Sequence, residues 1–343
     1  MKSFKNLIVA VLVIVTMAAV CIIPASAMVM TDSYFKYEVN FISHEATITK
    51  CLSNDTDIIV PSHYMDYKVT AIDGYAFENN QTLTTLSLPS TITRIENYAL
   101  YNCKCLKYFT VPESVTYLGQ SFCQGCTSLE KVYFKSSSIS AVPVSAFSGC
   151  ESLNFVQLNP SITTIGQSAF MGCSSLKETG FISDVSKIER IAFYKSGVET
   201  VDMKDGVEAI YDYTFAECAS LQRVNVPQSV TYIDDRAFAD SGNLTLGVNY
   251  ESYAHQYAVE KNIPYILLDA VLLGDVNDDG EITISDVTDI QRYLAELIIL
   301  NDNQLAAADT NRDGTVDISD ATALQMYLAD YNIPYPIGEY ITI

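Results

Sequence analysis

The 343-residue sequence contains no tryptophan and only three histidines, and its 20 Lys and Arg are outnumbered by 41 Asp and Glu. The histidines, His44, His63 and His255, lie outside any zinc spacing such as HExxH, and no GxSxG nucleophile elbow occurs. The formal net charge of −21 disfavours nucleic acid as a partner, because phosphate binding needs clustered cations. These absences favour a protein that is not an enzyme.

Long apolar runs are also missing, except at the N-terminus. There, two lysines within the first five residues precede an apolar run over residues 7–24, and Ala25-Ser26-Ala27 supplies small residues for cleavage. This order predicts a signal peptide over residues 1–27, a mature chain that begins at Met28, and secretion without membrane attachment. The alternative is an uncleaved anchor, because the run reaches the length of a short membrane span.

Residues 69–246 contain an internal repeat of 22 to 24 residues. Its marker is a small-aromatic pair such as Ala169-Phe170, with an aliphatic pair upstream and, in most units, a Leu-x-x-aliphatic-x-aliphatic run downstream. The alternation in that run is a strand pattern. Because such a unit cannot bury its apolar face alone, about eight units are expected to stack as a solenoid with a parallel sheet. Strands over 28–68 and a cap with a short junction over 247–271 would close its ends.

Eight cysteines remain after the predicted cleavage, an even number that would suggest disulfides in a secreted chain. However, five of them occupy one position of the repeat: Cys103, Cys126, Cys150, Cys173 and Cys218. We therefore expect a buried column of free thiols that pack as small apolar side chains.

The run from Ile165-Gly166 through Leu176 resembles the IGxxAFxxCxxL signature of BspA-like bacterial leucine-rich repeats, and the likeness covers most of residues 35–265. The resemblance implies a leucine-rich repeat solenoid, a parallel β-sheet with short helical and turn segments. Tyr108, Tyr133 and Phe155 lie on neighbouring predicted strands and are the candidate ligand face. Tyrosine can serve as a stacking surface where tryptophan is absent. The alternative is an ordinary solvated sheet face.

Two twelve-residue segments near the C-terminus share one pattern: Asp, Asn and Asp at positions 1, 3 and 5, Gly at 6, and Asp at 12. Ca²⁺ takes six to eight oxygen ligands, with a backbone carbonyl at position 7 and often a water at 9. The pattern therefore predicts two Ca²⁺ ions, although Asp replaces the usual Glu at position 12. The predicted ligands are Asp275, Asn277, Asp279, Glu281, Thr283 and Asp286 in the first loop, and Asp309, Asn311, Asp313, Thr315, Asp317 and Asp320 in the second. The alternative is a pair of solvated acidic turns.

Each loop is followed by apolar residues at helical spacing. These stripes are Val287, Ile290, Leu294 and Leu297, and then Ala321, Leu324, Leu328 and Tyr331. We expect two loop–helix units whose folding depends on Ca²⁺, because so small a module buries little apolar surface. The tail over 333–343 is expected either to fold back on Val271 and Leu272 or to fray.

This arrangement, over residues 272–332, resembles a type I dockerin, a small all-α module with two EF-hand-like calcium loops. The resemblance implies calcium-dependent binding to a cohesin module of a scaffoldin. It places the cohesin contacts at Ile284, Ser285, Gln291, Arg292 and Glu296, and at Ile318, Ser319, Gln325, Met326 and Asp330. The two sets match at Ile-Ser and at Gln, as symmetric two-way binding requires, and differ where Arg292 corresponds to Met326.

Taken together, these features predict a secreted, non-catalytic component of a cell-surface cellulosome that takes part in plant polysaccharide degradation. The dockerin would attach it, and the repeat domain would bind a protein or a carbohydrate. Two alternatives stay open: a polysaccharide-degrading hydrolase, because most dockerin-bearing proteins are such enzymes, and an adhesin or protein-interaction module.

Overall fold

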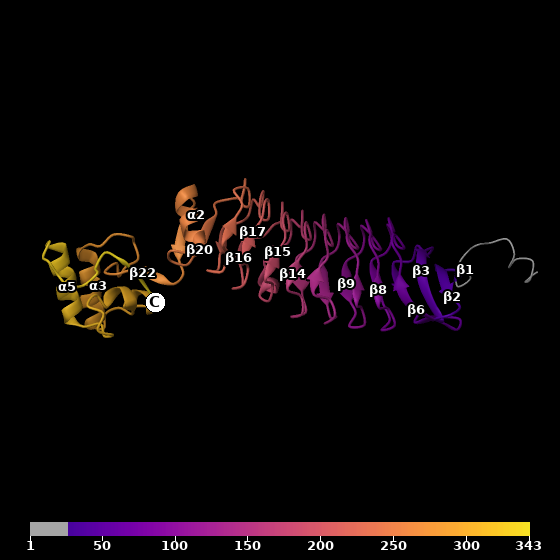
Figure 1. Cartoon of the computed structure of the whole chain (residues 1–343), viewed down its shortest axis with the longest axis horizontal. Helices are drawn as coiled ribbons and strands as arrows, with labels where there is room; N and C mark the ends of the chain where they lie inside the picture. The colour runs from indigo at the N-terminus through magenta and orange to yellow at the C-terminus, as the bar shows by residue number, and fades with distance from the viewer. Residues whose placement is uncertain (1–26) are drawn as a thin grey trace, which may run out of the picture. The chain divides into compact units, whose positions relative to one another are not determined.

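The computed structural model describes residues 27–343. The chain divides into two compact units, Met1–Ile139 and Ser140–Ile343. Both contain short strands stacked one solenoid turn after another, and the second also carries a helical module (Figure 1). The predicted signal peptide lies outside the described residues except for Ala27, which begins β1 (Ala27–Thr31). No helix within the described part of the chain has the length and apolarity that a membrane span requires.

The first unit begins with an antiparallel meander of β1, β2 (Phe35–Asn40) and β3 (Glu45–Cys51). Every second residue of β2, from Phe35 to Val39, is buried. β3 then pairs in parallel with β6 (Tyr67–Ile72), the first strand of the repeats. The meander therefore covers an edge of the sheet that would otherwise be open to pairing with another chain.

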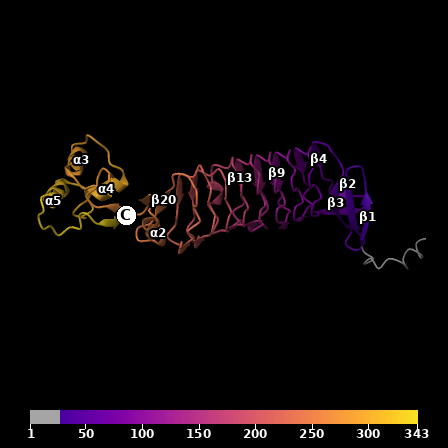
Figure 2. The ribbon, with the colours of Figure 1, turned by 90° about the horizontal axis from the view of Figure 1, so that it is seen from above.

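Beyond the meander, the first unit arranges its strands in two rows (Figure 2). One row contains β6, β8 (Arg94–Ile95) and β10 (Tyr117–Leu118), with β5 (His63–Tyr64) antiparallel to β6. The other contains β4 (Asp57–Ile59), β7 (Thr85–Ser87), β9 (Tyr108–Val111) and β11 (Lys131–Phe134), all parallel. Lys131 of β11 lies opposite Tyr108 of β9, one repeat earlier. This register confirms the predicted solenoid with parallel strands.

The second unit is built from the same kind of turn. One row contains β16 (Thr200–Asp202), β18 (Arg223–Asn225), β20 (Thr245–Val248) and β21 (Tyr265–Leu267). The shorter strands are β12 (Ala141–Val142), β14 (Thr164–Ile165) and β15 (Lys187–Ile188), which pair in that order, and the pair β17 (Ala209–Ile210) and β19 (Tyr232–Ile233). β13 (Phe155–Gln157) also belongs to this unit.

One turn of the second unit lacks the strand that the other turns have. In its place, η1 (Gly180–Ile182) forms a short 3₁₀ turn. Only a single bridge, between Glu178 and Thr200, pairs this segment with β16. The Thr179 hydroxyl donates a hydrogen bond of 2.9 Å to the carbonyl of Thr200. A side chain thus satisfies a carbonyl at the edge of β16, as a neighbouring strand would otherwise do.

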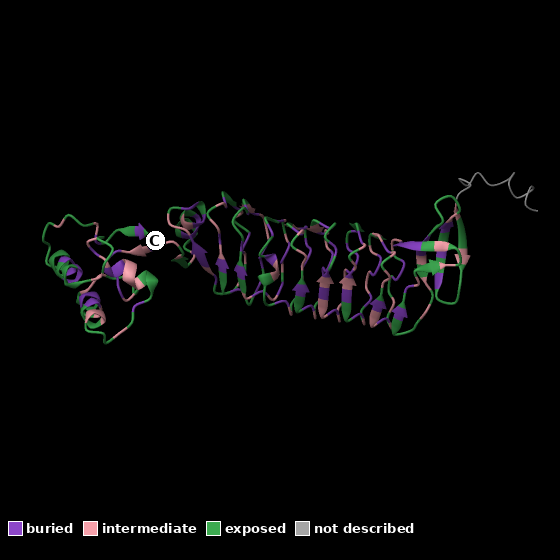
Figure 3. Ribbon diagram, turned by 90° about the horizontal axis from the view of Figure 1, so that it is seen from below, coloured by how far each residue is buried: buried purple, intermediate pink, exposed green. Residues whose placement is uncertain are grey.

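The core of the second unit is a ladder of phenylalanine rings, one from each repeat. Successive rings lie between 5.4 and 6.0 Å apart, centroid to centroid, and are nearly parallel. The rings belong to Phe147, Phe170, Phe193, Phe215 and Phe238. Buried and exposed residues alternate along the strands (Figure 3), as a sheet with one face in the core requires.

The five aligned cysteines are free and buried, as expected, and most of them also donate hydrogen bonds. In four of them, the Sγ donates to a carbonyl of the preceding turn, at 3.0 to 3.2 Å. The pairs are Cys103 with Phe77, Cys126 with Leu100, Cys173 with Phe147, and Cys218 with Phe193. The buried column of free thiols is therefore confirmed, and the hydrogen bonds add a role that the sequence does not show, because the thiol is also a weak donor.

The last strand of the repeats is followed by α2 (Tyr253–Lys261). Ser252 caps its N-terminus by accepting a hydrogen bond from the backbone of His255, and Asn262 ends it in the left-handed conformation. Ala254, Tyr257 and Ala258 form its buried face. This helix agrees with the cap that the sequence predicts after the solenoid.

The C-terminal module contains α3 (Ile284–Leu294) and α5 (Ile318–Leu328), the two helices that the sequence predicts after its loops. It also contains α4 (Asp302–Ala308), which the sequence pattern does not predict because seven residues are too few to show an amphipathic period. A capping box of Asn301 and Gln304 fixes the start of α4. α4 leads directly into the second loop.

The C-terminal tail, residues 333–343, folds back on the module, which is one of the two outcomes expected from the sequence. β23 (Tyr340–Thr342) pairs antiparallel with β22 (Ala270–Leu272), and Val271 lies opposite Ile341. Ile337 and Ile341 join the apolar core that Val287, Ile290 and Leu324 form between α3 and α5. The module is thus closed by a two-stranded sheet and is not purely helical.

Candidate functional site

The two predicted calcium loops run into the starts of α3 and α5, and their last four residues form capping boxes. In the first loop, Thr283 caps α3 by accepting a hydrogen bond from the Ser285 amide, and the Asp286 carboxylate accepts one from the Thr283 amide. In the second loop, Asp317 and Asp320 make the same arrangement at α5. The short aspartate at position 12 therefore lies at the third helical residue and holds the helix close to its loop.

Asp286 and Asp320 also reach back across their loops. Asp286 Oδ1 accepts hydrogen bonds from the backbone amides of Val276 and Asn277, at 2.8 and 3.1 Å. Asp320 Oδ1 accepts from the Asn311 amide at 3.1 Å and from the Thr310 hydroxyl at 3.3 Å. Both carboxylates are fully buried. Each loop is thus closed by its position-12 side chain, which joins its end to its beginning.

The position-1 aspartates organise the middle of each loop. Asp275 accepts hydrogen bonds from the amides of Asp279 and Gly280, at 3.1 and 2.8 Å. Asp309 accepts the equivalent pair of bonds, at 3.1 and 3.0 Å. Gly280 has a φ of +85°, a left-handed conformation that favours glycine. The two loops therefore share one geometry, as their matched sequences predict.

The chemistry of the loops suits a hard cation. Apart from the Arg312 side chain, their polar side chains are oxygen-bearing carboxylates, amides and hydroxyls, which Ca²⁺ prefers. Burial, followed by repulsion from Asp286 and Asp279, raises the pKa of the Asp275 carboxyl. Burial, with repulsion from Asp309, likewise raises the pKa of the Asp320 carboxyl. A bound cation would relieve both repulsions.

Within residues 27–343, no three His, Cys, Asp or Glu side chains converge as a ready-made metal cluster. In each loop, aspartate carboxylates accept hydrogen bonds from backbone amides of the same loop. Position 9 is likewise engaged, because Thr283 and Asp317 serve as helix caps. Glu281 and Thr315 at position 7 are exposed, and their backbone carbonyls are the predicted ligands. The donor atoms of the two loops thus suit Ca²⁺, and the twelve individual ligands are those that the sequence predicts.

The ten predicted cohesin contacts are all exposed. Ile284 and Ile318, the first residues of α3 and α5, have 66% and 64% of their surface in solvent although both are large and apolar. Each is followed by a serine, and Gln291 and Gln325 lie further along the same helices. Arg292 forms an ion pair of 3.2 Å with Asp289, whereas its counterpart Met326 is exposed and uncharged. The two helix starts are thus alike, and the faces diverge further along.

The last members of the two predicted core stripes are not in the core. Leu297 and Tyr331 are 71% and 64% exposed, and Leu328 is 36% exposed. The helices end earlier than the stripes, and Glu296 and Asp330 turn the chain with φ of +56° and +59°. The expectation that these residues are buried was wrong. Leu297 and Tyr331 lie beyond the ends of α3 and α5, where helical spacing no longer applies, and Leu328 is the last residue of α5. They add apolar surface beside the predicted cohesin contacts.

The candidate ligand face on the repeats is less regular than the sequence suggests. Tyr108 of β9 lies opposite Lys131, and Tyr133 of β11 lies opposite Thr110, so the two tyrosines are offset by two residues along their strands. The Tyr108 hydroxyl donates to Glu130 at 3.3 Å. Phe155, 43% exposed, belongs to the second unit.

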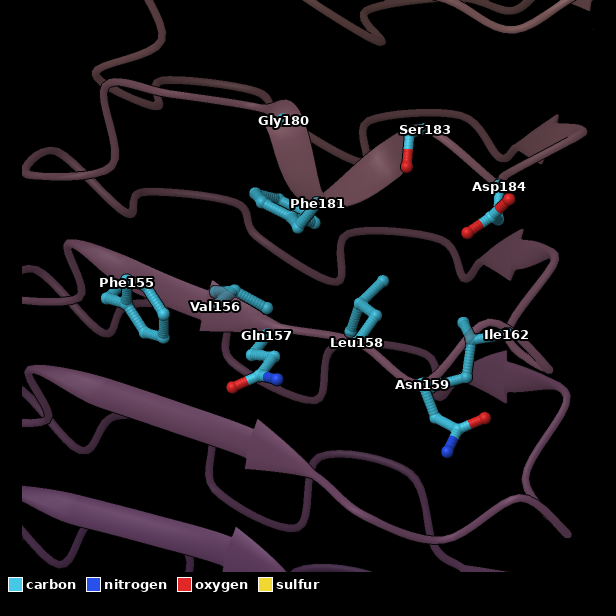
Figure 4. A pocket seen from close by; sticks show the side chains of 10 residues that line it. All are labelled: Phe155, Val156, Gln157, Leu158, Asn159, Ile162, Gly180, Phe181, Ser183 and Asp184. Atoms are coloured by element: carbon cyan, nitrogen blue, oxygen red, sulfur yellow. The ribbon is translucent and has the colours of Figure 1, made fainter.

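Phe155 lines a pocket of about 230 Å³ in the second unit (Figure 4). Figure 4 shows Phe155 and Phe181 at one end, and Ser183, Asp184 and Asn159 at the other. The pocket lies where η1 replaces a strand, and a Cβ added at Gly180 would meet nothing within 4 Å. A missing side chain in the row of strands therefore helps to open this pocket.

Two protein families match the chain. The BspA type leucine rich repeat region matches residues 56–156 and 140–255, which together make up more than half of the chain. The dockerin type I domain matches residues 273–329. No curated protein matches.

Solved structures with similar folds come from several bacteria. A leucine-rich repeat protein from Eubacterium ventriosum is 23% identical over 62% of this chain, with a TM-score of 0.44, and this chain spans 50% of its length. One from Bacteroides ovatus is 19% identical over 64% of this chain and 70% of its own, with a TM-score of 0.44. A leucine rich cell surface protein from Faecalibacterium prausnitzii is 21% identical over 70% of this chain and 98% of its own, with a TM-score of 0.35.

Proposed function

The chain belongs to the BspA type leucine-rich repeat family and carries a C-terminal type I dockerin domain, and on this basis we propose that it is a secreted, non-catalytic component of a cellulosome. Type I dockerin domains bind calcium, and a dockerin implies a cohesin partner. The observation that carries the proposal is the pair of matched loops that present Ile284 and Ile318 to solvent at the starts of two helices.

The proposed cohesin contacts are the ten exposed residues on α3 and α5. An exposed isoleucine next to a serine offers an apolar anchor beside a hydroxyl group, a combination that suits the core of a protein interface. The test is binding of the full-length chain to immobilised type I cohesin modules, with calcium and with excess chelator. Calcium-dependent capture is expected. Equal capture in chelator, or none by any cohesin tested, would contradict the proposal.

The repeat domain is proposed to bind a protein or a carbohydrate and so to bring a target to the complex. Solenoids expose long surfaces of this kind for binding. The test uses the full-length chain with Asp275→Ala and Asp309→Ala, which blocks capture through the dockerin. This variant is incubated with milled plant cell wall and, separately, with secreted culture proteins. Retention on cell wall favours a targeting module, whereas capture of one discrete protein favours an adhesin or scaffold role.

Absence of catalysis is part of the proposal. Glycoside hydrolysis generally needs two carboxyl groups facing each other across the bond to be cleaved. In the pocket of Figure 4, the only carboxylate among the described lining residues is Asp184. Release of reducing sugar from cell-wall polysaccharides by the purified chain, abolished by a single carboxylate substitution, would overturn this part.

An extracellular, surface-attached location completes the proposal. The predicted signal peptide and the dockerin favour export, and the similar protein from Faecalibacterium prausnitzii is described as a cell surface protein. Detection of the chain in the washed cell-surface fraction, released by chelator, is the expected result.

A further inference from the structure

A larger pocket lies in the first unit, away from the strands predicted to carry the ligand face. It measures about 540 Å³, within the range of roughly 300 to 1,000 Å³ typical of small-molecule sites. One wall is formed by the end of β3 and the residues after it (49–51, 53 and 54), and the other is the turn formed by residues 74–82. Both walls belong to the N-terminal end of the solenoid.

The pocket is lined by the ring of Tyr75, which is 50% exposed. Tyr75 stacks on Tyr98, with ring centroids 4.9 Å apart and an angle of 5° between the planes. Tyr98 comes from the following solenoid turn, whereas the other wall of the pocket comes from the preceding one. One face of the Tyr75 ring is thus packed against Tyr98, while half of the residue's surface stays exposed beside the pocket.

The repeats themselves show that the fold does not need tyrosine at this position. Tyr75 adopts a φ of +61°. At the equivalent position of later turns, Ser121, Ser145 and Ser168 adopt φ of +53° to +56°, and Tyr98, Ile191 and Tyr213 adopt φ of +55° to +62°. Serine therefore satisfies the same left-handed turn. The turn therefore accepts serine as well as a bulky side chain, so the turn by itself does not require a ring at position 75.

The walls of the pocket are tied to each other by hydrogen bonds. The amide of Cys51 donates to the carbonyl of Ala76 at 2.6 Å. The Asn80 side chain donates to the carbonyl of Ser53 at 3.2 Å. A site whose walls are already fixed loses little conformational entropy when a ligand binds.

Three polar side chains that line the pocket have no hydrogen bond or ion pair with any residue in the range 27–343: Lys50, Asn54 and Glu78. Together they offer an ammonium, an amide and a carboxylate. The two opposite charges disfavour a ligand with a strong charge of either sign. A neutral ligand rich in hydroxyl groups could donate to Glu78 and accept from Lys50 and Asn54.

We propose that this pocket binds one or two rings of a neutral oligosaccharide, with the apolar C–H face of a sugar on the Tyr75 ring and its hydroxyl groups on Lys50, Asn54 and Glu78. The inference rests on the proposed function, because it gives the repeat domain a carbohydrate as its target. A peptide is the competing occupant, and it would not require an aromatic ring with a free face.

The test uses the full-length chain with calcium and the variant Tyr75→Ser, which introduces the residue that the fold itself uses at this turn. Binding of cellohexaose, xylohexaose and mannohexaose is measured by titration calorimetry and by tyrosine difference absorption. No tryptophan absorption overlaps the tyrosine signal, because the chain has no tryptophan. At least one is expected to bind, and Tyr75→Ser should weaken that affinity by about tenfold or more. Polygalacturonate, a polyanion, should bind more weakly than the neutral probes.

The matched control is Tyr213→Ser, at the equivalent turn of a later repeat, where the Arg236 guanidinium already covers the ring at 5.1 Å. This variant should bind as the unaltered chain does. Three results would overturn the pocket assignment: an equal loss of affinity in both variants, no effect of Tyr75→Ser on affinity, or no binding of any probe. Cell-wall retention that survives Tyr75→Ser would leave the proposed function standing and refute only this site.

Discussion

The Sγ of Cys218 donates a hydrogen bond of 3.0 Å to the carbonyl of Phe193, one solenoid turn earlier. At the same position of the next turn, the Ser241 hydroxyl makes the equivalent bond of 2.5 Å to the carbonyl of Phe215. Two side chains that differ in polarity but both donate a hydrogen bond thus occupy one column, with Cys218 buried and Ser241 partly buried. The position selects for a small hydrogen-bond donor.

The first prediction follows from this donor role. Cys173→Ala should lower the free energy of unfolding by about 1 kcal/mol, because it removes the bond to the carbonyl of Phe147 and leaves a small void. Cys173→Ser should cost less, since serine keeps the donor. The measurement is the shift of the urea unfolding midpoint of the full-length chain. If serine proved more damaging than alanine, apolar packing and not hydrogen bonding would explain the column.

The second prediction concerns alkaline pH. Burial raises the pKa of the Cys173 thiol, and burial also raises the pKa of Tyr257 to about 12. The folded chain therefore binds these protons more tightly than the unfolded chain does. This contribution to stability is fully present below the thiol pKa of the unfolded chain, about 8.5. It falls as the pH rises toward the thiol pKa of the folded chain. Unfolding midpoints measured from pH 7 to pH 11 should decline above about pH 8.5. The Cys173→Ser variant should show a shallower decline, and an unchanged slope would contradict the assignment.

The third prediction is that calcium protects the C-terminal module. Binding to the folded state alone stabilises it by about 2.7 kcal/mol per site at a hundredfold excess over the dissociation constant. Limited proteolysis of the full-length chain in chelator should therefore cut within residues 273–329 and spare the repeats. Asp275→Ala with Asp309→Ala should be cut in the same way even with calcium. An identical digestion pattern with and without calcium would refute the metal assignment.

The fourth prediction separates the two proposed cohesin faces. Ile284→Asp and Ile318→Asp each place a charge on one face, whereas the other face keeps its Ile-Ser pair. Each single variant should retain cohesin binding within about threefold, and the double variant should lose about a hundredfold or more. The exposed Asp302→Ala on α4 serves as the control. If one single variant alone abolished binding, only that face would be functional, as the difference between Arg292 and Met326 would explain.

Much of this architecture can be predicted from the sequence, because equivalent residues of successive repeats must stack on one another. Each Phe170-like residue must stack on its counterpart one turn away, and each strand must pair with its neighbour, whatever the distant parts of the chain do. The calcium loops are equally local: Asp275 and Gly280 lie in one twelve-residue segment, and the short spacing alone brings them together. For the same reason α3 and α5 are predictable, since each begins with the capping box that ends its loop.

What the sequence left undecided depends on contacts between turns or on where an element stops. The donor role of Cys218 appears only when the carbonyl of Phe193 is placed beneath it. Leu297 and Tyr331 continue a helical pattern, but the helices end before them, and end points depend on capping and packing that periodicity does not record. The exposure of Tyr75 beside the pocket likewise depends on packing between turns, because Tyr98 of the next turn covers one face of its ring. Local spacing determined the solenoid and its calcium loops, and only tertiary packing decided which side chains remained exposed to meet a partner.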